Sequence, residues 1–143
     1  MPKRLRLAHL SLLVREYDEA IAFYVNKLGF TLEEDTDLGN AKRWVRISPG
    51  AGSAELLLAR AVTDTQRAHI GNQTGGRVFL FLETDDFERD FGLYMARGVE
   101  IVRPPIEEPY GKVAVFADLY GNLIDLIQPT GLSALGEPPH PRA

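Results

Sequence analysis

Three polar side chains stand in or beside apolar runs, and their types are those that carry acid–base and metal chemistry. Asp125 lies inside the run Leu123 to Ile127, Glu55 stands just ahead of three leucines, and His9 lies in the leucine-rich stretch Leu5 to Val14. A carboxylate on a buried strand face is costly unless it is hydrogen-bonded, paired with a cation or bound to a metal. The sequence therefore predicts that these side chains have partners.

The spacing of the two carboxylates indicates a tandem repeat. Glu55 and Asp125 are separated by 70 residues (125 minus 55), and the same offset takes His9 to Phe79. Both His9 and Phe79 lie near the start of an expected strand, as a repeat requires. We therefore predict two modules in which corresponding positions lie 70 residues apart.

Periodicity predicts the elements that position these side chains. Two helices are expected at Tyr17 to Leu28 and Phe87 to Arg97, each with apolar residues at three- and four-residue spacing and each followed by glycine; Asp85-Asp86 is the expected cap of the second. Strands are expected at 5–14, 30–37, 42–48, 53–58, 78–84, 99–102, 113–117 and 123–127, with a break at Pro104-Pro105. The predicted fold class is α+β, with two tandem βαβββ modules.

Length and composition favour one compact body. A chain of 143 residues suits a single domain or two small fused modules. We predict one domain over residues 1–128, made of module one (about 5–60), a polar connector (about 61–76) and module two (about 77–128). The Pro- and Gly-rich residues 129–143 are predicted to be a tail, so His140 within it is not expected to be a ligand.

Charge and cysteine content exclude several classes of protein. The net charge is −4 and the basic residues cluster only at Lys3-Arg4-Leu5-Arg6, so no nucleic-acid partner is expected. No stretch of eighteen apolar residues and no signal sequence is present, so no membrane association is expected. The absence of cysteine removes thiolate sites and suits a cytoplasmic protein.

The tandem modules with His9, Glu55 and Asp125 resemble the vicinal oxygen chelate superfamily, which includes glyoxalase I, extradiol dioxygenases and metal-free bleomycin-binding proteins. The resemblance covers roughly residues 5–128. It implies curved mixed sheets that form a cleft, and homodimers are common among members. It also places His9 and Glu55 at ligand positions of the first module, Asp125 where the second module usually has glutamate, and Phe79 at the remaining ligand position.

Two functions follow from this resemblance. One is a metal-dependent enzyme with lyase, isomerase or dioxygenase chemistry on a small molecule with vicinal oxygens. In it His9, Glu55 and Asp125 hold Mn, Fe, Ni or Zn, either carboxylate doubles as base, and no nucleotide cofactor is needed. The other is a metal-free binding or resistance protein that sequesters an aromatic compound, with Phe79 as an aromatic surface and His9 only hydrogen-bonding a carboxylate.

Three further residues are candidates for substrate binding. Trp44 is predicted to stack on a ligand and Arg43 to meet an anionic group; the alternative is a packed aromatic beside an exposed arginine. Tyr110 either donates a hydrogen bond to a substrate oxygen or only packs over the mouth of the site.

Overall fold

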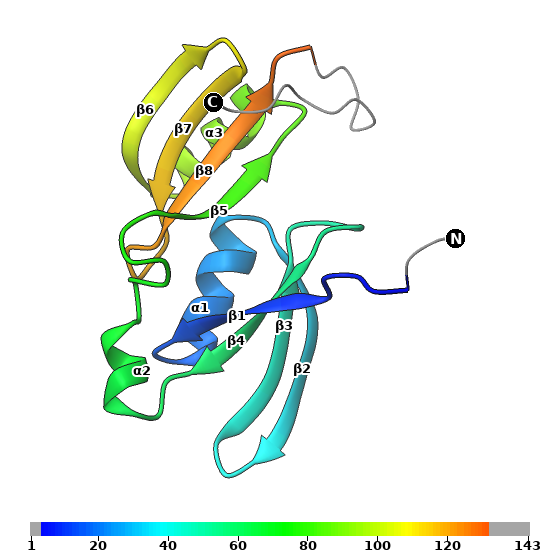
Figure 1. Cartoon of the computed structure of the whole chain (residues 1–143), viewed down its shortest axis with the longest axis vertical. Helices are drawn as coiled ribbons and strands as arrows, with labels where there is room; N and C mark the ends of the chain where they lie inside the picture. The colour runs from blue at the N-terminus through cyan, green and yellow to red at the C-terminus, as the bar shows by residue number, and fades with distance from the viewer. Residues whose placement is uncertain (1–3, 132–143) are drawn as a thin grey trace. The chain divides into compact units, whose positions relative to one another are not determined.

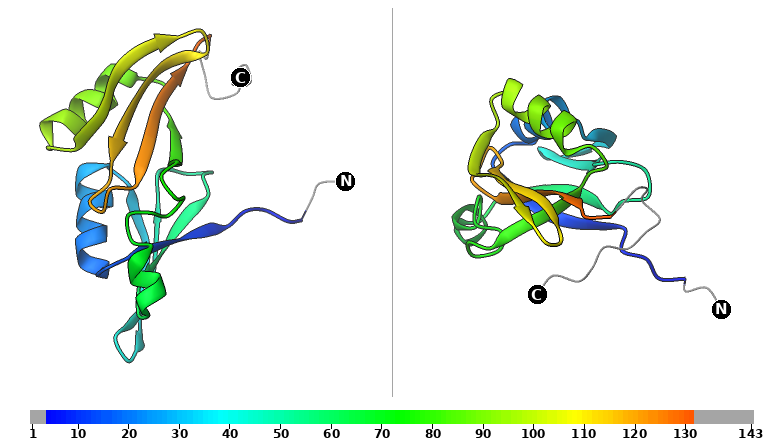
Figure 2. Two further views of the ribbon diagram at one scale, coloured as in Figure 1. Left: turned by 60° about the vertical axis from the view of Figure 1, so that its left-hand side comes forward. Right: turned by 90° about the horizontal axis from the view of Figure 1, so that it is seen from above.

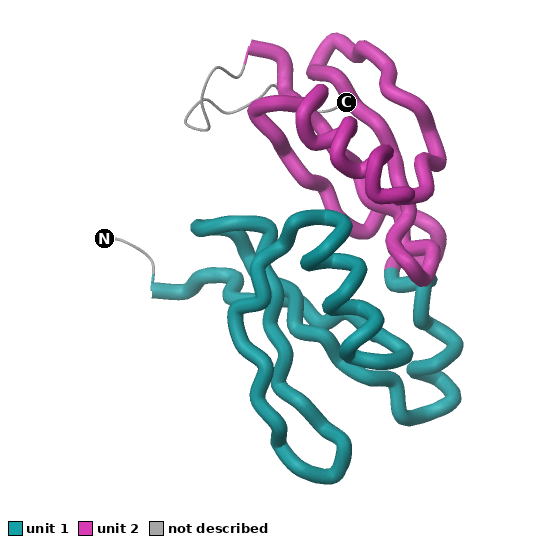
Figure 3. Tube along the Cα trace, turned by 180° about the vertical axis from the view of Figure 1, so that it is seen from behind, with its two compact units in different colours: residues 1–73 teal, residues 74–143 magenta. Residues whose placement is uncertain are grey.

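The computed structural model describes residues 4–131, and the chain divides into two compact units, Met1–Gln73 and Thr74–Ala143 (Figure 3). The boundary between the units falls inside the predicted connector. Residues 132–143, most of the predicted tail, lie outside the described part of the chain. None of the helices within residues 4–131 has the length and apolar character needed to cross a membrane.

Unit 1 is a four-stranded mixed sheet with a helix against one face (Figure 1). Its elements are β1 (His9–Val14), α1 (Tyr17–Ile21), η1 (Ala22–Lys27), β2 (Thr31–Gly39), β3 (Lys42–Ser48), β4 (Glu55–Arg60) and α2 (Asp64–Ala68). The strand order is β1-β4-β3-β2, with β1 parallel to β4 and the other pairs antiparallel. Alternation along the strands sends Leu12, Val45 and Leu58 into the core and leaves the opposite face for polar side chains.

Unit 2 repeats this arrangement. Its elements are β5 (Val78–Glu83), α3 (Phe87–Ala96), β6 (Glu100–Glu108), β7 (Gly111–Ala117) and β8 (Leu123–Pro129), in the order β5-β8-β7-β6 with β5 parallel to β8. The helix lies across one face of the sheet (Figure 2), where Tyr94 packs on Phe116 with ring centroids 5.0 Å apart. The two mixed sheets confirm the predicted α+β fold of tandem βαβββ modules.

The first helix differs from its prediction. We expected one helix over Tyr17 to Leu28, but α1 is five residues long and continues as the π-helix η1. The wider turn appears in the hydrogen bond from Leu28 N to Phe23 O at 3.2 Å, which joins residues five apart. Gly29, at φ 79°, ends the helix as predicted.

A short helix lies in the predicted connector. Thr63 caps α2 by accepting a hydrogen bond from Gln66 N at 3.1 Å, and the Gln66 side chain accepts from Val62 N at 2.8 Å. This pattern is close to a capping box, which is a signal present in the sequence. Farther along the connector, the Gln73 amide accepts from Leu13 N and donates to Ser11 O, both at 3.1 Å. Gln73 thereby covers part of the open edge of β1.

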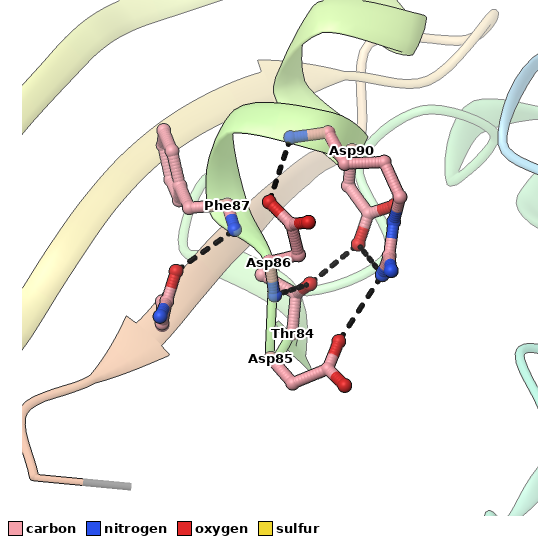
Figure 4. Close-up of polar contacts among 7 residues, drawn as sticks. Thr84, Asp85, Asp86, Phe87 and Asp90 are labelled. Atoms are coloured by element: carbon pink, nitrogen blue, oxygen red, sulfur yellow. Dashed lines mark hydrogen bonds and ion pairs between the residues drawn. The ribbon is translucent and has the colours of Figure 1, made fainter. Parts of the chain in front are cut away.

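The N-terminus of α3 is fixed by the predicted acidic cap (Figure 4). Asp86 accepts from Arg89 N at 3.1 Å, and Gln128 of β8 accepts from Phe87 N at 2.8 Å. Arg89 bridges Asp85 and Asp90, and the Thr84 hydroxyl donates to Asp90. These contacts satisfy amides that a helix N-terminus leaves open, and they tie α3 to β8.

Strand β6 is longer than predicted because its prolines do not break it. It runs through Pro104-Pro105, and its register against β7 shifts between Ile101 and Arg103 and again between Arg103 and Ile106. Each shift adds one residue on β6, which is the geometry of a β-bulge. Strand β6 is an edge strand, where a proline without an N–H costs no ladder hydrogen bond.

Candidate functional site

The open face of the unit 1 sheet brings together three of the predicted site residues. Because β1 and β4 are parallel, His9 stands directly opposite Glu55. The His9 ring also meets Trp44 of β3 edge to face, with centroids 5.7 Å apart and planes at 84°. The structure therefore gathers His9, Glu55 and Trp44 on the face opposite the helix.

Glu55 has a fixed cation, Arg46, which the sequence reasoning missed. Arg46 Nη1 lies 2.5 Å from Glu55 Oε1, and Arg46 Nε lies 3.1 Å from Glu34 Oε1. These hydrogen bonds, first that to Glu55, raise the pKa of Arg46. The sequence contained the signal, since a residue two positions from Trp44 on one strand shares its face. The Glu55 carboxylate is thus neutralised by a guanidinium.

Arg43 lies on the other face of the sheet from Trp44. Its guanidinium binds Asp35 at 2.7 Å and Asp18 at 2.9 Å and lies over the Tyr17 ring, 5.1 Å from the centroid. The hydrogen bond from Arg43 holds the pKa of Asp35 below its usual value. Neighbouring residues on a strand point to opposite faces, so the predicted wall of Arg43 and Trp44 side by side is not what the structure shows. Arg43 ties β3 to β2 and α1.

In unit 2 a row of four paired residues crosses the sheet. Phe81 of β5 pairs with Asp125 of β8, Asp125 with Val115 of β7, and Val115 with Arg103 of β6. The offset of 70 residues had placed Phe79 beside Asp125. A register shift between Val78 and Leu80 makes Phe79 the extra residue of a bulge, and Phe81 takes the place opposite Asp125.

This row lines a pocket of about 780 Å³, which we call the Asp125 pocket. Its wall carries Phe81, Ile106, Tyr110 and Val113, and Asp125 is only 6% exposed. Tyr110 and Asp125, both predicted site residues, therefore meet in one pocket, whereas Phe79 is not part of its lining. Phe81 is 57% exposed, so its ring presents apolar surface to whatever enters. Sequence reasoning missed Phe81 because it counted residues and could not see the bulge.

The predicted metal ligands do not form a site in the described residues. His9 and Glu55 belong to unit 1 and Asp125 to unit 2. Between residues 4 and 131, no group of three or more His, Cys, Asp or Glu side chains is placed to hold a metal ion. Glu55 is also bound by Arg46, whose charge a divalent cation would have to displace. The donor set seen in this part of the chain does not fit the predicted ion.

Comparisons with known proteins give a consistent family. The model of the Glyoxalase/Bleomycin resistance protein/Dioxygenase superfamily matches residues 6–126. An uncharacterized protein of Shewanella frigidimarina (strain NCIMB 400) is 58% identical over 124 residues, covering 85% of this chain and 92% of the relative. Two crystal structures are also similar. UcmS2 has 29% identity and a TM-score of 0.75, covering 87% of this chain and 98% of its own. TnmS3, an antibiotic binding protein from Streptomyces sp. CB03234, has 30% identity and a TM-score of 0.73, covering 91% and 100%.

Proposed function

Because the chain belongs to the glyoxalase, bleomycin resistance protein and dioxygenase superfamily, we propose that it is a metal-free binding protein that sequesters an aromatic small molecule. The observation that carries this proposal is the Asp125 pocket, in which a phenylalanine ring stands directly beside the buried carboxylate. A ring at that place supplies a surface for stacking, where metal chemistry requires a donor atom. We assign the pocket, rather than a metal centre, as the binding site.

The size and lining of the pocket suit an organic molecule. Sites for drug-sized ligands typically measure about 300–1,000 Å³ and are mostly apolar with a few polar groups, and the Asp125 pocket falls in that range. Covering about 150 Å² of apolar surface on Phe81, Ile106 and their neighbours contributes about 4 kcal/mol at roughly 25 cal/mol per Å². Stacking on Phe81 adds about 0.5–1.5 kcal/mol. Tyr110 and Asp125 supply hydrogen bonds that orient the ligand.

The similarity to TnmS3 supports a role in resistance. That protein is described as an antibiotic binding protein, and it matches this chain over nearly the whole length of both. We therefore propose that the ligand is an antibiotic-like aromatic compound and that binding alone, without chemical conversion, lowers its free concentration.

A metal-dependent glyoxalase-like or dioxygenase-like enzyme is the second candidate. The observation in its favour is the register that sets His9 opposite Glu55, which gives two of the three predicted ligands on one sheet face. Against it stands Arg46, which already binds Glu55. In this reading Asp125 would have to supply the third ligand.

Fluorescence titration with N-phenyl-1-naphthylamine, a neutral aromatic probe, tests the binding function. We expect saturable binding, and Phe81→Ala is expected to weaken it about tenfold because it removes the stacking surface, roughly 1.4 kcal/mol. Leu93→Ala is the matched control, since Leu93 is an exposed apolar residue of α3 outside the pocket. Wild-type protein that does not bind the probe, or binding that Phe81→Ala leaves intact, contradicts the proposal.

Thermal shift with Mn²⁺, Fe²⁺, Ni²⁺ and Zn²⁺, each with and without EDTA, separates the two candidates. A sequestering protein is expected to keep its melting temperature in all of these conditions and to gain stability only from organic ligands. Stabilisation by one ion that EDTA reverses, and that His9→Ala abolishes, would replace the binding function with the metal-dependent one.

The predicted homodimer is part of this proposal. Leu5, Leu7 and Leu10 are exposed apolar residues on and just before β1, which is an edge strand of the unit 1 sheet; Leu5 is 90% exposed. Exposed apolar residues along a sheet edge are typical of association surfaces. Sedimentation equilibrium is expected to give twice the chain mass, and Leu5→Asp combined with Leu7→Asp to give a monomer. A wild-type monomer contradicts this part.

A further inference from the structure

Two arginines of the Asp125 pocket have no protein partner in the described structure. Arg77 and Arg103 both line the pocket, and neither side chain forms a hydrogen bond or ion pair with any residue in 4–131. By contrast, Arg43, Arg46 and Arg89 each bind two carboxylates. A guanidinium presents five donors in a planar fork that matches an anionic group. The pocket therefore holds open donors beside its apolar wall.

Backbone geometry favours Arg103 over Arg77 as the residue that reaches the ligand. Arg103 belongs to the row of Phe81, Asp125 and Val115, so its position lies on the strand row that lines the pocket. It stands between the two bulges of β6, and bulges re-aim the side chains they carry. The following residues, Pro104-Pro105, have fixed φ angles and restrict the backbone there. Arg77 precedes β5 and lacks this support.

The acidic residues of the pocket set the direction of a bound ligand. Asp125 is buried beside Phe81, so it repels an anionic group at that end of the row. Glu108 lies five residues beyond Arg103 on β6, about 16 Å along the strand at roughly 3.3 Å per residue. Phe81 and Arg103 are separated by three strand spacings of about 4.8 Å, so their backbones are about 14 Å apart. The anionic end of a ligand is favoured at Arg103, away from both acids.

From these contacts we propose that the Asp125 pocket selects aromatic anions, with the ring on Phe81 and the carboxylate, sulfonate or phenolate bound by Arg103. This inference rests on the proposed binding function and adds the charge and orientation of the ligand. Arg103 is then a specificity-determining residue, because it rewards the anionic group while the ring contributes the sequence-independent apolar term. Neutral aromatics of the same shape bind the pocket more weakly.

The test compares two probes that differ only in charge. N-phenyl-1-naphthylamine is neutral, and 8-anilinonaphthalene-1-sulfonate is the same skeleton with a sulfonate. We expect the wild type to bind the sulfonate about tenfold more tightly, and Arg103→Gln to remove that preference while changing neutral-probe affinity less than about twofold. Arg97→Gln is the matched control, because it removes one positive charge outside the pocket lining. Circular dichroism checks that each variant is folded, since the sulfonate also binds partly unfolded proteins.

The outcomes separate this inference from the function on which it rests. If the neutral probe binds through Phe81 but the sulfonate has no advantage, the pocket binds aromatics and its preference for anions is wrong. The same conclusion follows if Arg103→Gln and Arg97→Gln weaken the sulfonate equally, because the effect is then one of overall charge. Selective weakening by Arg77→Gln alone would overturn the assignment to Arg103. If neither probe binds, both the function and the inference fail.

Discussion

Gly111 is the position at which a single methyl group should do the most damage close to the pocket. This buried residue begins β7 directly after Tyr110, and its φ is +152°, a value that L side chains rarely adopt. A Cβ built on Gly111 would lie 2.4 Å from the carbonyl oxygen of Gln128 and 2.9 Å from Cα of Pro129. Both contacts are to the backbone of β8, which pairs with Gly111, so no side chain can rotate away.

The structure gives the size of the expected effect. Cβ atoms essentially never approach closer than 3.0 Å, so Gly111→Ala requires a shift of at least 0.6 Å (3.0 minus 2.4) between two paired strands. An unfavourable φ costs about 1–3 kcal/mol, and each ladder hydrogen bond that the shift weakens costs about 1 kcal/mol. We expect a loss of about 3 kcal/mol in the free energy of unfolding, or about 10 °C in Tm at this chain length.

Urea unfolding followed by circular dichroism measures this loss, with Gly92→Ala as the matched control. Gly92 is an exposed residue in the interior of α3, its φ is not positive, and nothing lies within 4 Å of a Cβ built there. Alanine at that site should stabilise the protein by about 0.5–1 kcal/mol. If Gly111→Ala unfolds at the wild-type urea midpoint, the close approach of β7 and β8 is not what the structure indicates. Destabilisation by both variants equally would also refute the reasoning.

Three further predictions concern the hydrogen bonds that hold each unit together. Asp86→Ala removes the N-cap of α3 and is expected to lower the free energy of unfolding by about 1 kcal/mol in urea, with Asp86→Asn as the variant that keeps the cap. Burial raises the pKa of Asp90, but hydrogen bonds from Arg89 and Thr84 outweigh it and hold that pKa below 3.8. The ionised form therefore stabilises the folded state above pH 4 and loses this effect as pH falls through the lowered pKa, so Asp90→Asn is expected to flatten the fall in stability measured between pH 5 and pH 2. Gln73→Ala removes two bonds to the edge of β1 and is expected to cost about 1–2 kcal/mol; unchanged hydrogen exchange at the Leu13 amide would contradict it.

Elements with strong periodicity could be predicted closely. The strand Lys42–Ser48 has the bounds expected from its alternation, and α3 ends one residue before its prediction. Apolar spacing is set by the face that each element buries, and that face is visible in the sequence. The same reasoning identified Asp125 as a polar residue in a buried strand, and the structure places it in a pocket. The two-residue capping signal of α2 was present but was not used.

Register could not be predicted, and it decides the identity of the site. The 70-residue offset holds between Glu55 and Asp125, but the residue opposite Asp125 is 72 positions after His9 (81 minus 9). Connections between strands absorb extra residues at little cost, so a repeat keeps its fold while its offset drifts. The bulge at Phe79 then changes which side chain faces Asp125. Neither event leaves a mark in composition or periodicity.

The two units use arginine in opposite ways, and this contrast supports placing the binding function in unit 2. On the unit 1 sheet, Arg46 binds Glu34 and Glu55, so its donors are occupied and the face carries a closed ion-pair network. On the unit 2 sheet, Arg103 has no described partner, and the acidic member of its row, Asp125, lies two strands away. Charges already paired within a protein offer little to a ligand, since binding must first break those pairs, whereas an open guanidinium beside an apolar wall has only water to lose. Equivalent sheets therefore yield one face built for stability and one pocket built for recognition.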